Sequence, residues 1–345
     1  MVYFSQTLWN CEDHTLSTKK NHTIDYLKAL AAIFVVMHHA ILYINADQHS
    51  VIWLVVRNAI MYTHVPLFFV IAGYLCYQQN FRAYIQKKVL RILIPFFLFS
   101  FLKLFYSIFI SSEFSHGTSI GSQFFSAFVC GSLYWFPYAI LLSYCFAVFF
   151  WTPKNEDPSL LKKVAVPVTI ICLILLNARY YLPDFKTLSY FQLGSAVRFF
   201  VFFLIGMFIR QHANKLSLFF SRKKLLILPV CLALMAVSSY WLVRNQESYN
   251  YLFEFILALS FMVILLEICR KLPQNLIPLK LAGNYSLQIM FFDSFNKVVL
   301  FALLPRFFHM DLILILLAVI LNLLITISSC TIIKKIPYLR TLFGL

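Results

Sequence analysis

Charged residues are scarce in this sequence. Asp, Glu, Lys and Arg make up only 12% of its 345 residues, whereas hydrophobic residues make up 61%. A soluble globular domain carries about twice that share of charge, so the composition excludes this class. The sequence therefore predicts an all-helical integral membrane protein.

The sequence also lacks features of secreted and metal-binding proteins. Its first residues, MVYFSQTLWNCEDHTLSTKKNHT, are polar and contain no apolar core of the length that a secretory signal needs. Its cysteines form no CxxC pair, and most lie in or beside apolar runs, where cysteine acts as a small hydrophobic residue. We expect a cytoplasmic amino-terminal tail over residues 1–23, no disulfide framework and no metal site.

The net charge of +16 does not indicate a nucleic-acid-binding protein. The basic residues occur in small groups between apolar stretches, whereas a nucleic-acid interface gathers them into one stripe with stacking aromatic residues. We expect membrane lipids around this chain and no nucleic acid.

Ten runs of the sequence are long and apolar enough to cross a bilayer, which takes about 20 residues. Charged or turn residues separate the runs. The predicted spans are residues 24–44, 57–78, 92–111, 124–151, 164–179, 196–210, 225–243, 251–269, 281–304 and 311–333. The sequence thus predicts a bundle of about ten transmembrane helices.

Lys and Arg are concentrated in alternate loops of this ten-span arrangement. Short cytoplasmic loops retain these residues, so the groups around Lys88, Lys223 and Lys334 are predicted to lie on the cytoplasmic side with both termini. No repeat, linker or soluble domain interrupts the series. We therefore predict a single multi-span domain over residues 24–345 with a short cytoplasmic carboxy-terminal tail.

The run KALAAIFVVMHHA places ionisable residues inside the first predicted span. Lys28 and His39 are eleven positions apart, so on a helix they lie about 20° from the same face and about 16 Å apart along the axis. Asp25 lies near that face, whereas His38 is turned about 100° from His39. Lys28 could reach the headgroups with Asp25 as its partner, but the depth of His39 in the membrane favours a functional site. We expect His38 to pack against another helix and to be dispensable for chemistry.

Three segments resemble a known family. The stretch DYLKALAAIFVVMHHA, followed by VPLFFVIAGYL and KKVLRILIP, is similar to the start of the acyltransferase 3 family of membrane-bound bacterial O-acyltransferases. That family has Arg or Lys, ten residues and then His in its first span, which Lys28 and His39 match. It also has an Arg-x-x-Arg pair after its second span, which Lys88 and Arg91 match with a lysine in the first place.

The resemblance implies transfer of an acyl group, usually acetyl from acetyl-CoA, to a hydroxyl of a sugar, lipid-linked glycan or surface polysaccharide by an enzyme of the bacterial inner membrane. Acyl-CoA would be a substrate, so no bound cofactor is expected. We assign His39 as the general base and expect Lys28 to steady the thioester or the phosphopantetheine arm, with Asp25 holding Lys28 in place. Lys88 and Arg91 are expected to bind the CoA phosphates.

Three further residues are candidates for lining the same cavity. His64 lies in the second span, although a histidine hydrogen-bonded between helices is a simpler interpretation. Trp135, in LYWFPYAIL, resembles a tryptophan at the start of a later span of the family. Asp293, in GNYSLQIMFFDSF, stands where many members have His; its spacing from Lys297 first suggests an ion pair within one helix.

Two other functions fit a multi-span protein with buried charges. One is a polysaccharide or small-molecule exporter, for which inverted repeats would be expected; none is visible in this sequence. The other is a structural subunit of an envelope complex. Transfer of label from acyl-CoA to an acceptor would separate the enzyme from both.

Overall fold

The computed structural model describes residues 22–76, 81–109, 119–150, 167, 191–245 and 251–345. Within these ranges the regular elements are helices, and no strand occurs. The predicted all-helical fold class is therefore confirmed. The first helix begins at His22, and residues 1–21 of the predicted tail lie outside the described residues.

Eight helices in the described part of the chain are long and apolar enough to cross a membrane. They are α2 (His22–Tyr43), α4 (Val51–Cys76), α5 (Phe81–Phe109), α9 (Leu193–Gln211), α10 (Ala213–Arg244), α11 (Tyr251–Lys271), α13 (Ser286–Leu303) and α14 (Asp311–Ile333). The shorter elements are α3 (Ala46–His49), α6 (Ile120–Phe128), α7 (Trp135–Phe150), α12 (Ile277–Asn284), the 3-10 helix η2 (Leu304–Arg306) and α15 (Pro337–Leu342). The chain is a multi-pass membrane protein.

The predicted fourth span, residues 124–151, is not one helix. α6 ends at Phe128 and α7 begins at Trp135. Between them Gly131 has a φ of 65°, a left-handed conformation that glycine adopts without the steric cost of a side chain. Within the described residues α7 spans 16 residues. The predicted fifth span, 164–179, falls almost entirely outside the described residues.

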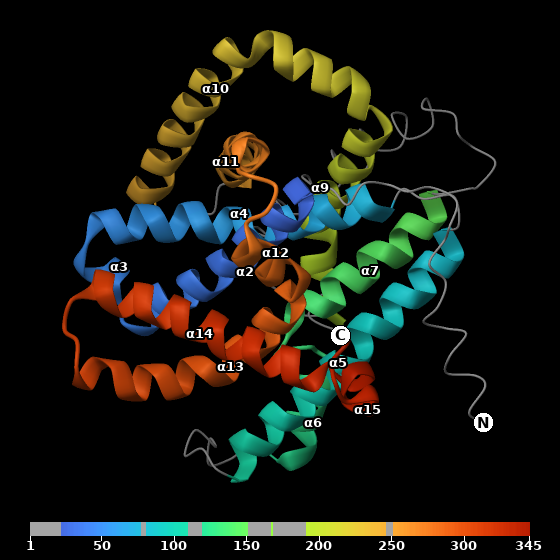
Figure 1. The fold of residues 1–345 in the computed structure, drawn as a ribbon, viewed down its shortest axis with the longest axis vertical. Coiled ribbons are helices and arrows are strands. Elements are labelled where there is room, and N and C mark those ends of the chain that lie inside the picture. Colours follow the sequence, from blue (N-terminus) through green and yellow to red (C-terminus); the bar gives the residue numbers. More distant parts are fainter. Residues whose placement is uncertain (1–21, 77–80, 110–118, 151–166, 168–190, 246–250) are drawn as a thin grey trace.

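α2 lies inside the bundle and packs against α4, α11, α12, α13 and α14 (Figure 1). Its small side chains make this possible, because Ala29, Ala31, Ala32 and Ala40 are at most 1% exposed and let neighbouring helices approach closely. The carboxy-terminal part of α2, which carries the histidine pair, is consequently surrounded by other helices.

α4 and α9 touch through their backbones at two glycines. A Cβ on Gly73 would lie 1.9 Å from the carbonyl oxygen of Phe203, and a Cβ on Gly206 would lie 2.0 Å from that of Val70. Any side chain at either glycine would therefore force the helices apart. This antiparallel contact fixes the distance between the side chains that α4 and α9 carry farther along their length.

The side of the bundle formed by α10 exposes large apolar side chains. Leu225 is 94% exposed, and Leu226, Leu232 and Val237 are also more than half exposed. A soluble protein rarely presents so extended an apolar surface to water. These side chains therefore face the lipid.

Candidate active site

His39 of α2 contacts a buried carboxylate on α13. Its Nδ1 lies 2.5 Å from Oδ2 of Asp293, although the two residues are 254 positions apart in the sequence. Asp293 is only 1% exposed. An ionised carboxylate can only accept hydrogen bonds, so with Asp293 ionised the proton of this contact is on His39 Nδ1. The other ring nitrogen, Nε2, is then free of the carboxylate.

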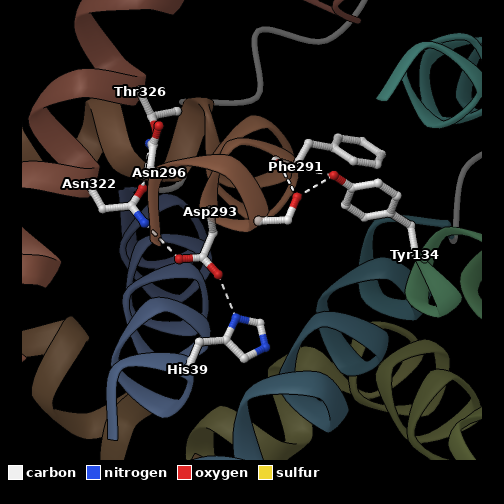
Figure 2. Close-up of polar contacts among 8 residues, drawn as sticks. His39, Tyr134, Phe291, Asp293, Asn296, Asn322 and Thr326 are labelled. Carbon is white, nitrogen blue, oxygen red and sulfur yellow. Dashed lines mark hydrogen bonds and ion pairs between the residues drawn. The ribbon is translucent and has the colours of Figure 1, made fainter. Parts of the chain in front are cut away.

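Asp293 is itself held by polar residues of α13 and α14. The Asn322 side-chain amide donates to Oδ1 of Asp293 at 2.6 Å, so His39 and Asn322 bind different oxygens of one carboxylate (Figure 2). Asn296 donates in turn to the Asn322 side-chain oxygen at 3.0 Å and to the Thr326 hydroxyl at 3.1 Å. A buried carboxylate is costly unless it is hydrogen-bonded, and this polar chain supplies the bonds.

A second contact ties α13 to the segment before α7. The Tyr134 hydroxyl is hydrogen-bonded to Ser294, the neighbour of Asp293, and lies 3.3 Å from the carbonyl oxygen of Phe291 (Figure 2). The residues that separate α6 from α7 thus help to hold the part of α13 that carries Asp293.

His39 lines a cavity of about 570 Å³ between α2, α4, α7, α9 and α11. His38, His39 and His64 form one part of its wall. The other lining residues are Met61, Tyr62, Val65, Pro66, Ser132, Trp135, Gln192, Gly194, Ser195, Arg198, Phe199, Val201, Phe202, Tyr251, Glu254 and Phe255. This volume is in the range of small-molecule sites.

His38 packs against another helix, as expected, and it also lines the cavity together with His39. The ring centroids of His38 and His39 are 5.5 Å apart, and that of His64 lies 5.5 Å from His38. Adjacent residues on a helix do diverge by about 100°, but both the His38 and the His39 side chains line this cavity. The Nδ1 atom of His64 lies 2.7 Å from the carbonyl oxygen of Ile60, so the ring is fixed by its own helix.

The part of the wall contributed by α9 and α11 carries a partly buried ion pair. Arg198 donates a hydrogen bond to Glu254, and its guanidinium lies over the Tyr251 ring at 4.9 Å. Trp135, at the start of α7, stacks on Phe199 with the ring centroids 5.6 Å apart. This part of the cavity therefore presents aromatic faces together with one positively and one negatively charged hydrogen-bonding group.

Asp293 does not line the cavity but lies behind His39. Its carboxylate contacts His39, so the intrahelical pair with Lys297 suggested by spacing is not the contact that the structure forms. A residue four positions away on the same helix can be a partner, but the packing of α2 against α13 brings His39 within reach instead.

Lys28 and Asp25 lie at the other end of α2. The Lys28 ammonium is 3.6 Å from the Asp25 carboxylate, and neither residue is among those that line the cavity. The structure therefore brings this pair together but does not bring it to His39. The predicted contact of Lys28 with a thioester stays a prediction.

Lys88 and Arg91 lie one turn apart on α5 and are also separate from the cavity. Arg91 Nε donates to the carbonyl oxygen of Gly344 at 3.0 Å, and the Gln288 amide donates to that of Phe343 at 2.9 Å. The carboxy-terminal segment is thus bound between α5 and α13 beside the basic pair. Binding of CoA phosphates by Lys88 and Arg91 stays a prediction.

Several site residues were missed from the sequence, although a signal for them was present. Asn322 interrupts the aliphatic run DLILILLAVILNLL, and Glu254 interrupts YLFEFILAL. Polar residues inside transmembrane helices commonly face the bundle interior and mark functional sites. The sequence does not show that Asn322 binds Asp293 or that Glu254 binds Arg198.

The comparisons with known proteins give one match. The family model described as an acyltransferase domain matches residues 21–333, a range that includes the histidines of the cavity, Asp293 and Asn322. Neither the curated proteins nor the solved structures gave a match.

Proposed function

Since the chain belongs to the acyltransferase domain family, we propose that this membrane acyltransferase moves an acyl group, usually acetyl, from acyl-CoA to a hydroxyl of a carbohydrate or lipid-linked sugar. His39 is the general base of the reaction. The observation that carries this proposal is the His39–Asp293 contact at the edge of a cavity of about 570 Å³.

The reaction begins with the acceptor hydroxyl beside His39 Nε2. Asp293 holds the proton on Nδ1, which leaves Nε2 as the acceptor. As the hydroxyl oxygen attacks the thioester carbonyl carbon, its proton passes to Nε2 and a tetrahedral intermediate forms. The carbon–sulfur bond then breaks, and the imidazolium returns the proton to the CoA thiolate.

Asp293 orients the base and stabilises its charged form. Its carboxylate lies beside the ring that gains a proton, and an anion there favours the imidazolium. Asn322 keeps the carboxylate in this orientation through the bond at 2.6 Å. Asp293 and Asn322 are therefore positioning residues, whereas His39 reacts with the substrate.

The donor is proposed to reach His39 from the cytoplasmic side of the bacterial inner membrane. Lys88 and Arg91 would meet the CoA phosphates, because arginine and lysine both bind phosphate. The Lys28–Asp25 pair lies about 16 Å from His39 along α2, on the route that the pantetheine arm would take. With both termini cytoplasmic, the cavity lies toward the opposite membrane surface.

The residues of the cavity wall support a class of acceptor. Trp135 and Tyr251 present aromatic faces, and Arg198, Glu254 and Gln192 present hydrogen-bonding groups. A sugar ring has apolar C–H faces that pack on aromatic rings and hydroxyls that pair with such polar groups. This composition supports a carbohydrate acceptor.

The test is transfer of label from radioactive acetyl-CoA to a panel of sugars and lipid-linked glycans by the purified protein in lipid nanodiscs. The wild type and His309→Ala, which changes an exposed histidine outside the cavity, should both transfer label. His39→Ala should lower the rate by about 10² to 10⁴. Absence of transfer by the wild type, with uptake of the sugar into proteoliposomes instead, would favour an exporter.

A further inference from the structure

His38 has two buried ring nitrogens, and neither forms a hydrogen bond within the described part of the chain. A buried polar atom without a partner costs about 1–3 kcal/mol, and such an atom in a native protein calls for an explanation. Because His38 lines the cavity, the substrate is the natural partner.

The two neighbouring histidines each use one ring nitrogen for a contact within the protein. His39 uses Nδ1 for Asp293, and His64 uses Nδ1 for the carbonyl oxygen of Ile60. A neutral imidazole carries one N–H donor and one acceptor nitrogen. His38 is therefore the histidine of this wall whose N–H is not used by the protein within the described residues.

We propose that His38 donates this N–H to the carbonyl oxygen of the acyl thioester and stabilises the oxyanion of the tetrahedral intermediate. The proposal rests on the acyl transfer proposed above. His39 takes the proton of the acceptor hydroxyl while the new carbon–oxygen bond forms, and the carbonyl π electrons move onto the oxygen that His38 contacts. When the carbonyl re-forms, the CoA thiolate leaves and takes the proton back from His39.

The spacing of the His38 and His39 rings suits an oxyanion donor beside a general base. The attacking oxygen and the oxyanion are bonded to the same carbon, so the base and the donor have to lie side by side. A general base acts within about 2.6–3.2 Å of its proton donor, and an oxyanion donor within about 2.7–3.1 Å of the oxygen. The His38 and His39 rings, with centroids 5.5 Å apart, lie side by side as this geometry requires.

The His38 ring has a neighbour of fixed orientation. Its centroid lies 5.5 Å from that of His64, and the His64 ring is held by the contact of its Nδ1 with the carbonyl oxygen of Ile60. The assignment replaces the expectation that His38 is dispensable for chemistry.

The test compares His38→Ala and His38→Gln with His39→Ala and the exposed-histidine control His309→Ala. Removing an oxyanion donor should lower kcat by about 10² to 10³ while leaving the KM for acetyl-CoA and the affinity for free CoA within about threefold of wild type. His38→Gln keeps an N–H donor and should recover at least about tenfold of that loss. Thermal unfolding in nanodiscs separates a folding defect from a chemical one, since Gln and Ala variants of equal stability should differ in kcat.

Two results would overturn the assignment. One is a kcat for His38→Ala within about threefold of wild type while His39→Ala is inactive, because the oxyanion would then have another donor. The other is a raised acceptor KM with unchanged kcat, which would make His38 a binding residue only. Absence of transfer by the wild type would instead refute the proposed function.

Discussion

Replacing Asp293 by asparagine tests the proposed proton path most directly. The two side chains have the same shape, so Asp293→Asn removes the negative charge without opening a cavity. The Asn322 amide can still donate to the side-chain oxygen that it binds at 2.6 Å. The change is therefore confined to the atom that faces His39.

At that position the new amide nitrogen would donate a hydrogen bond to His39 Nδ1. The ring proton would then be forced onto Nε2, the atom that has to accept the proton of the acceptor hydroxyl. In an Asp–His pair this exchange of tautomers lowers kcat by about 10⁴, with the geometry intact. That loss corresponds to about 5 kcal/mol in the barrier.

The assay is the initial rate of label transfer from acetyl-CoA by protein in nanodiscs, together with acetyl-CoA binding by calorimetry. Asp293→Asn should bind the donor as the wild type does and unfold at a similar temperature. Asp311→Asn, at the first turn of α14 and outside the cavity, is the matched control and should keep its activity. A rate for Asp293→Asn within tenfold of wild type would refute the tautomer argument.

Three further changes test the surroundings of the site. Asn322→Leu removes the hydrogen bond to a buried carboxylate, so kcat should fall about 10- to 100-fold and the unfolding temperature should drop; unchanged kinetics would show that Asp293 needs no support. Gly206→Val places a side chain against the Val70 carbonyl and should abolish folded protein in detergent by size-exclusion chromatography, whereas wild-type yield would contradict the close contact. Arg91→Ala should weaken acetyl-CoA binding more than Arg340→Ala, and added salt should weaken wild-type binding; equal affinities of the two variants would remove the proposed phosphate site.

The spanning helices could be predicted where an apolar run is both long and uninterrupted. α14, with its run of aliphatic residues from Leu312 to Leu321, begins and ends where the hydropathy and charge pattern indicates. The break between α6 and α7 could not be predicted, because hydropathy does not distinguish a continuous helix from two helices joined through a left-handed glycine. Gly131 decides that difference through its φ of 65°.

The site could be predicted only in part, and for the same reason. His39 stands out because an ionisable residue deep in an apolar helix requires a polar environment. Its partner does not stand out, since the contact with Asp293 joins residues 254 positions apart and depends on how α2 packs against α13. Helical periodicity correctly separates the directions of His38 and His39, but it carries no information on the width of the cavity between the helices.

The polar chain also explains why a carboxylate is tolerated in this part of a membrane protein. An isolated ionised carboxylate in an apolar medium would take up a proton, because burial penalises the charged form. Asp293 instead receives hydrogen bonds from His39 and Asn322, and Asn296 and Thr326 in turn satisfy the Asn322 oxygen. The hydrogen bonds that stabilise the Asp293 carboxylate thus also orient it toward His39 Nδ1. For this reason, folding stability and the orientation of the base depend on the same side chains, and a substitution of Asn296, Asn322 or Thr326 should affect both.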